Sequence, residues 1–169
     1  MKPLIVMGLR TLAHLEAKAT LYEEINQNTI TARRRFPKED MELLVGAGFT
    51  LGILSSHSIP RSQKVIEYLD LAHLFPERHL ICSSPLDRKE ALNWQEWSQT
   101  FNKRGLSIHT VIDIGDTLIR NLASSPNFKD IDKYLITDDT TIKIEGAKCL
   151  KTLDQIKAYD LAKKKGHNN

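Results

Sequence analysis

The sequence predicts an α/β protein in which a central, mainly parallel sheet of five strands lies between two layers of helices. Short apolar runs alternate along the chain with longer amphipathic segments, as they do where strands are joined by helical crossovers. Each apolar run is hydrophobic throughout, which is typical of strands that are buried on both faces. With 41% hydrophobic and 27% charged residues, the composition fits a globular chain with a packed core. We therefore expect a three-layer, Rossmann-like domain.

The apolar runs and the amphipathic segments define the expected elements. The strands are Pro3–Met7, Thr50–Ser55, His79–Cys82, His109–Ile114 and Lys133–Thr137. The first helix is expected where Leu12, Leu15 and Ala19 recur at helical spacing, and glycines follow several of the others. The helices are Thr11–Gln27, Pro37–Ala47, Ile59–Leu71, Pro85–Arg104 and Leu150–Lys165.

A chain of 169 residues has the usual length of one domain, and no linker rich in Pro, Gly or Ser divides it. We expect residues 1–169 to form a single domain. Residues 8–49 have room for two helices, and one helix fits between the second and third strands. This spacing leaves little length for an inserted cap domain.

Several classes of protein are disfavoured by composition. No run approaches the roughly 20 apolar residues that span a bilayer, and the apolar run at Pro3–Leu9 is short for a signal peptide. Cys82 and Cys149 lack the spacing of a disulfide framework or a zinc site, so the cytoplasm is the expected compartment. The net charge of +3 is too small to indicate a nucleic-acid partner.

Ligands of parallel sheets bind beyond the carboxyl ends of the strands, so the polar residues that follow the apolar runs are the candidate site. Ser55 and Ser56 follow the second strand, and Asp113 and Asp116 follow the fourth. Lys89 lies in the helix between the third and fourth strands. A hydroxyl, a lysine and a carboxylate are thus expected to converge at one edge.

Each of these residues also has an ordinary structural explanation. Serines at the end of a strand commonly shape loops, and a lysine on a helix is commonly solvated. Asp116 follows a glycine and is well placed to cap the next helix. The residues alone leave both readings open.

The order of these segments resembles the haloacid dehalogenase-like (HAD) phosphohydrolase superfamily. Gly48–Ser56 is similar to that family's second motif, whose hydroxyl binds the substrate phosphoryl group, which implies phosphate-binding roles for Ser55 and Ser56. Lys89 falls where the third-motif lysine would supply a fixed positive charge. Val111–Asp116 is similar to the fourth motif, whose carboxylate holds magnesium. The resemblance implies a HAD-like fold without a cap.

The chain departs from the family at the first motif, where two aspartates act as nucleophile and as general acid/base. Gly8 and Arg10 stand at those positions. Glycine has no side chain to attack phosphorus, and arginine stays protonated at any working pH. Arg120 also stands where the family often has another aspartate, so only Asp113 and Asp116 remain for a weak magnesium site.

Two functions follow from the resemblance. The first is a non-catalytic pseudophosphatase, a binding or regulatory module with a residual phosphate-type site formed by Ser55, Ser56 and Lys89. Ser55, Lys89 and Asp116 are then vestiges of the catalytic site. The second is an active magnesium-dependent phosphatase that uses Asp113 or Asp116 in place of the missing aspartate, as in a permuted domain. An open, capless site goes with macromolecular partners in this superfamily, so a protein partner is expected, and a phosphorylated ligand is compatible with the site. We expect Gly8, Ser55 and Asp116 to meet at the carboxyl edge of the sheet.

Overall fold

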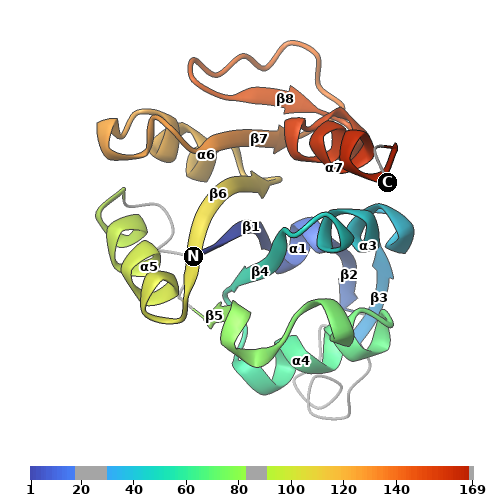
Figure 1. Ribbon diagram of the computed structural model, residues 1–169. Coiled ribbons are helices and arrows are strands. Elements are labelled where there is room, and N and C mark those ends of the chain that lie inside the picture. The colour runs from blue at the N-terminus through green and yellow to red at the C-terminus, as the bar shows by residue number, and fades with distance from the viewer. Residues whose placement is uncertain (18–29, 83–90, 168–169) are drawn as a thin grey trace.

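Six parallel strands form the central sheet of the protein, in the order β5-β4-β1-β6-β7-β8 (Figure 1). The structure is a computed structural model, and it describes residues 1–17, 30–82 and 91–167. In chain order the strands of this sheet are β1 (Lys2–Gly8), β4 (Thr50–Ser55), β5 (Leu80–Cys82), β6 (Leu106–Asp113), β7 (Asp132–Ile136) and β8 (Lys148–Leu150). A separate antiparallel pair consists of β2 (Ala13–Ala17) and β3 (Ile30–Arg34).

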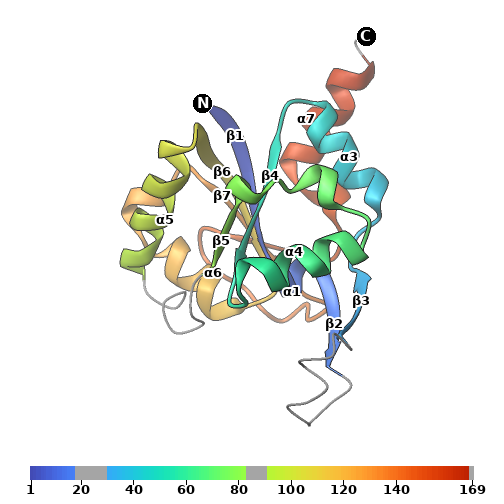
Figure 2. The ribbon, with the colours of Figure 1, turned by 90° about the horizontal axis from the view of Figure 1, so that it is seen from below.

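Helices cover both faces of the sheet. They are α1 (Leu9–Leu12), α3 (Lys38–Gly46), α4 (Ile59–Tyr68), α5 (Ala91–Lys103), α6 (Asp116–Ala123) and α7 (Lys157–His167). Short 3-10 turns occupy Ala72–Leu74, Glu77–His79, Pro126–Phe128 and Leu153–Gln155. Helices α3, α4 and α7 lie on one face, and α5 and α6 lie on the other (Figure 2).

Strand β1 explains why the apolar runs show no polar alternation. Ile5 and Met7 are fully buried in the core beneath α3, α4 and α7. Leu4 and Val6 point the other way, into the core that α5 and α6 cover. Because both faces of β1 are covered, every side chain from Leu4 to Met7 is removed from water. Burial of these apolar side chains stabilises the folded state.

The architecture is the three-layer α/β, Rossmann-like arrangement that the sequence predicts, with six strands instead of five. The added strand, β8, is three residues long and only partly buried, so its sequence carries little strand signal. Its last residue is Leu150, the first residue of the expected helix Leu150–Lys165, and helix α7 begins only at Lys157. No helix in residues 1–17, 30–82 or 91–167 has the length and apolarity needed to cross a membrane.

The helix expected over Thr11–Gln27 is wrong in its described part. A single helical turn, α1, is followed by β2, which pairs with β3 from Ala13↔Arg34 to Ala17↔Ile30. Residues 18–29 lie outside the described part of the chain. Ala13 and Leu15 are two positions apart and contact the same core, as a strand requires, whereas the spacing of Leu12 and Leu15 also fits a helix. Pairing with β3 favours the strand over the helix. A pattern within residues 11–17 contains no information about this pairing.

The other expected elements agree with the structure to within a few residues. Helix α5 matches the described part of Pro85–Arg104, and residues 83–90 lie outside the described ranges. Helix α3 ends at Gly46 and is followed by Gly48, whose φ of +103° favours glycine. The expected helix Pro37–Ala47 therefore has the correct stop signal.

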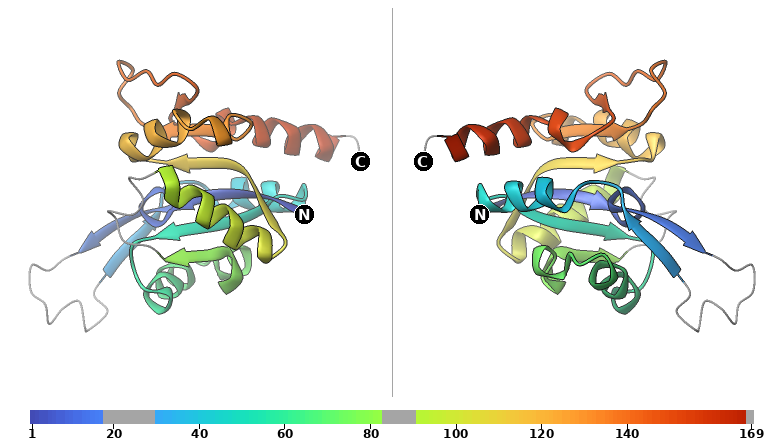
Figure 3. Two further views of the ribbon diagram at one scale, coloured as in Figure 1. Left: turned by 90° about the vertical axis from the view of Figure 1, so that its left-hand side faces the viewer. Right: turned by 90° about the vertical axis from the view of Figure 1, so that its right-hand side faces the viewer.

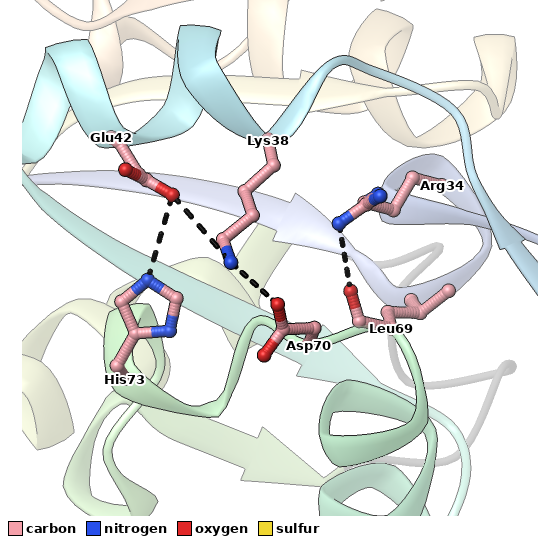
Figure 4. Close-up of polar contacts among 6 residues, drawn as sticks. All are labelled: Arg34, Lys38, Glu42, Leu69, Asp70 and His73. Atoms are coloured by element: carbon pink, nitrogen blue, oxygen red, sulfur yellow. Dashed lines mark hydrogen bonds and ion pairs between the residues drawn. The ribbon is translucent and has the colours of Figure 1, made fainter.

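Polar contacts join α3 and the β2–β3 pair, called here the β2–β3 hairpin, to the turn that follows α4 (Figure 4). Lys38 Nζ lies 2.5 Å from Asp70 Oδ2 and 3.8 Å from Glu42 Oε1. The ammonium of Lys38 lowers the pKa of Asp70. Arg34 Nη1 donates to the carbonyl oxygen of Leu69 at 3.2 Å, which ties β3 to the same turn. Asp70 has a φ of +60°, which Asp tolerates better than most residues.

Candidate functional site

The candidate site lies at the carboxyl edge of the sheet, where β4, β1 and β6 end side by side. Gly8 is in register with Leu54 of β4, and Met7 is in register with Ile112 of β6. Ser55 and Asp113, the last residues of β4 and β6, therefore flank Gly8 at this edge. Asp116 begins α6 three residues after Asp113, on the same edge. The chain leaves this edge into α1 and the β2–β3 hairpin, which projects away from the sheet (Figure 3).

Gly8 is packed against the carboxylate of Asp113. A Cβ atom added to Gly8 would lie 2.7 Å from Asp113 Oδ2 and 3.4 Å from Thr11 Oγ1. The backbone of Gly8 has φ −71° and ψ 153°, an extended conformation open to any residue. Glycine is therefore required here by the neighbouring carboxylate and not by the backbone.

Asp113 is buried and its carboxylate is oriented by the loop that follows. The residue is 8% exposed, and its Oδ1 accepts a hydrogen bond from the Gly115 amide at 2.7 Å. Thr11, which is fully buried, accepts a hydrogen bond on Oγ1 from the Ile114 amide at 3.0 Å. These two contacts join the turn after β1 to the turn after β6.

Arg35 holds the helical turn that carries Arg10. Its Nε donates to the carbonyl oxygen of Thr11 at 3.0 Å, and its Nη2 donates to that of Arg10 at 2.9 Å. Burial lowers the pKa of Arg35, the charge of Arg33 lowers it further, and Asp138 opposes both effects. The carbonyl groups of α1 thus take up two donors of Arg35, whereas Arg10 itself is exposed.

Ser55 is more enclosed than its expected role requires. It is fully buried, and its Oγ accepts hydrogen bonds from Ser62 Oγ at 2.8 Å and from the His57 amide at 3.0 Å. Cys82 ends β5 in register with Ser55, and burial raises the pKa of its thiol while Ser62 opposes the shift. Ser56 is half-buried and is the more accessible hydroxyl of the pair.

Asp116 stands in the first turn of α6, where the helix dipole favours a negative charge. Its Oδ2 lies 3.6 Å from Arg120 Nε, and both side chains are about half exposed. Arg120, which the resemblance places at an aspartate position, therefore pairs with Asp116. The expected third-motif residue, Lys89, lies outside the described residues.

Two aspartates on the same edge, Asp138 and Asp139, were not among the residues selected from the sequence. They follow β7, so the rule that selected Asp113 also applies to them. Asp139 Oδ1 accepts hydrogen bonds from the Thr141 hydroxyl at 2.6 Å and its amide at 2.9 Å, and both bonds lower the pKa of Asp139. A cavity of about 440 Å³ lies beside Asp139, and its lining includes Thr137 but not Asp113.

Within the described ranges, no three His, Cys, Asp or Glu side chains are grouped in a way that could hold a metal ion. The chain matches no model of a known protein family, and no curated protein matches its sequence. Its function is therefore inferred from the chemistry of this edge together with the motif resemblance.

Proposed function

We propose that this protein is a non-catalytic HAD-like module that binds a partner and keeps a phosphate-type site at the carboxyl edge of its sheet. The proposal rests on the environment of Gly8. The residue at the first-motif position, Gly8, has no side chain, and the carboxylate of Asp113 lies 2.7 Å from the point where one would begin. The position that holds the nucleophile in the family is thereby closed to any side chain without rearrangement.

The strand order supports the HAD-like interpretation. The family motifs resembled here belong to the first strand, the second expected strand and the fourth expected strand. These correspond to β1, β4 and β6, which are neighbours in the sheet. Their ends bring Gly8, Ser55 and Asp113 to one edge, as a shared phosphate site requires.

A residual phosphate site on this edge would use Ser56 and Lys89. Ser56 offers an accessible hydroxyl, whereas the Ser55 hydroxyl is engaged with Ser62 and the following backbone. Lys89 is carried over from the resemblance as the positive charge that attracts phosphoryl oxygens. In this proposal Ser55 shapes the loop and Ser56 contacts the ligand.

Magnesium fits this edge poorly. Magnesium is usually held through one or two accessible carboxylates together with waters and substrate phosphates. Asp113 already accepts a hydrogen bond from the Gly115 amide, and Asp116 lies beside the guanidinium of Arg120. We therefore expect any magnesium binding at this edge to be weak.

A protein is the partner that the resemblance favours, because open sites go with macromolecular partners in that superfamily and the sequence leaves little length for a cap. Ile114 is 38% exposed directly after Asp113, so an apolar side chain borders the site at this edge. The β2–β3 hairpin projects from the same edge (Figure 3). A partner that approaches the phosphate site would meet both features.

A second candidate is an active phosphatase in which Asp113 replaces the missing nucleophile. The closeness of its carboxylate to the empty first-motif position favours this candidate. The burial of Asp113 and its bond to Gly115 oppose it, because a nucleophile has to approach phosphorus in line. Loss of turnover in Asp113→Asn is the signature of this second function.

Isothermal titration calorimetry with inorganic phosphate tests the proposed binding site. We expect Lys89→Met to weaken phosphate binding at this edge by about tenfold or more, since a charged donor is lost. Ser56→Ala is expected to weaken it less. Lys164→Met removes the same charge from exposed α7 and is the matched control. Phosphate affinity that is identical in Lys89→Met and the control would contradict the proposal.

A further inference from the structure

A second cavity, of about 400 Å³, lies at the opposite edge of the sheet, where β7 and β8 begin. Four lysines line it, and the lining contains a single carboxylate, that of Asp132. The lysines are Lys129, Lys133, Lys148 and Lys157. Its volume is in the range of ordinary small-molecule sites. The predominance of positive charge indicates an anionic ligand.

Lys133 is the unusual member of this set because it is 5% exposed. Its Nζ donates to the carbonyl oxygen of Ile131 at 2.9 Å, and Ile131 lines the same cavity. In the described part of the chain, Lys133 makes no other side-chain hydrogen bond and no ion pair within 4.0 Å. An ammonium has three N–H groups, so two remain to be satisfied at a site where desolvating a charge is costly.

No carboxylate in the described part of the chain forms an ion pair with the ammonium of Lys133 within 4.0 Å. Burial lowers the pKa of Lys133, and the charges of Asp132 and Asp130 oppose this effect without forming such an ion pair. The cavity wall therefore contains a buried cation whose hydrogen-bonding capacity is mostly unused. A bound oxyanion would supply both the missing acceptors and the opposite charge.

We propose that the cavity at the start of β7 and β8 binds a small phosphate-class oxyanion, with Lys133 as its buried ligand and Lys148 as an accessory charge. Phosphate-class ligands are favoured over monocarboxylates because several lysines surround one cavity and a phosphate spreads two or more charges over its oxygens. The remaining lining lysines raise the local concentration of anions.

This site is independent of the proposed function. Strand β7 runs from Asp132 at this edge to Ile136 at the other, and its parallel neighbour β6 ends at Asp113 on the far edge. The two sites therefore lie at opposite ends of the strands. Variants at one edge are expected to leave binding at the other unchanged.

Calorimetry with inorganic pyrophosphate, in the presence of EDTA, tests this inference on the full chain. We expect one bound pyrophosphate at this edge, with affinity reduced at least about tenfold in Lys133→Met and several-fold in Lys148→Met. Lys133→Met keeps an unbranched side chain of similar length, and Lys148 is exposed, so both variants are expected to fold. Lys164→Met, on exposed α7 and outside the cavity lining, controls for net charge.

The pyrophosphate titrations distinguish the amino-edge site from the carboxyl-edge site. Binding that is lost in Lys133→Met and retained in Lys89→Met supports the amino-edge site. Binding that is lost in Lys89→Met and retained in Lys133→Met assigns the anion to the carboxyl edge, which overturns this inference and supports the proposed function. Absence of binding at millimolar pyrophosphate, or equal weakening in Lys164→Met, also overturns it.

Discussion

Substitution of Gly8 by alanine tests the contact on which the functional proposal depends. The new Cβ would lie 2.7 Å from Asp113 Oδ2, a distance that real methyl groups do not adopt. The carboxylate has to retreat by about 0.7 Å to restore ordinary van der Waals contact. It cannot move freely, because its other oxygen accepts the Gly115 amide at 2.7 Å and the residue is buried.

The expected loss of stability in Gly8→Ala follows from the close approach to Asp113 and from the hydrogen bond that holds its carboxylate. Overpacking a closed site costs about 1–3 kcal/mol, and a weakened hydrogen bond to a carboxylate is worth up to about 1.5–3 kcal/mol. We expect Gly8→Ala to lower the free energy of unfolding by about 2 kcal/mol. The extended backbone of Gly8 accepts alanine, so strain in the main chain adds nothing.

A double-mutant cycle with Asp113→Ala separates this contact from other effects. Without the carboxylate, Gly8→Ala is expected to be neutral or to stabilise by up to about 1 kcal/mol, because it reduces the freedom of the unfolded chain. Urea unfolding followed by tryptophan fluorescence provides all four free energies. A cost that is the same in both backgrounds, or no cost in the wild-type background, would refute the contact between position 8 and Asp113.

Three further predictions concern stability. Asp70→Ala should melt at a lower temperature than Asp70→Gly in calorimetry, because φ is +60° at this position and both variants lose the ion pair to Lys38; equal melting temperatures would contradict this. Burial lowers the pKa of His79, whose Nδ1 is hydrogen-bonded to the carbonyl oxygen of Leu51. The unfolded state therefore takes up a proton first, and the free energy of unfolding falls as the pH drops below 6.5. His79→Asn, which keeps a donor but cannot titrate, should lose less stability between pH 7.5 and 5.5 in urea unfolding. Lys133→Met should raise the free energy of unfolding at pH 7. This gain should shrink as the pH rises and should vanish above 10.5, where the side chain of Lys133 is neutral in the folded and the unfolded state.

Local sequence patterns were sufficient for the strands that are covered on both faces. Thr50–Ser55 was predicted with the bounds of β4, because five of its six residues are buried and both faces are apolar. The β2–β3 hairpin was missed because its pairing joins positions far apart in sequence, such as Ala13 and Arg34. β8 was missed because it is three residues long, with one exposed and two half-buried, and so leaves no periodic signal.

The candidate site was predictable in place but not in detail. Parallel topology alone indicates that the strands ending near Gly8 and Asp113 finish at one edge of the sheet. That these two strands, β1 and β6, are neighbours follows only from the structure. That Asp113 closes the space beside Gly8 depends on a side-chain conformation fixed by the Gly115 amide, and no sequence pattern encodes it. The engagement of Ser55 by Ser62 likewise depends on how α4 packs against β4.

In the proposed function the chain lacks phosphatase chemistry, because β1 ends in Gly8 and carries no carboxylate there. Turnover of p-nitrophenyl phosphate in excess magnesium tests this proposal, with wild-type protein, Asp113→Asn and a protein-free control measured together. We expect all three to give the same rate. Magnesium-dependent turnover by the wild-type protein that disappears in Asp113→Asn would contradict the proposal and would identify Asp113 as a working nucleophile.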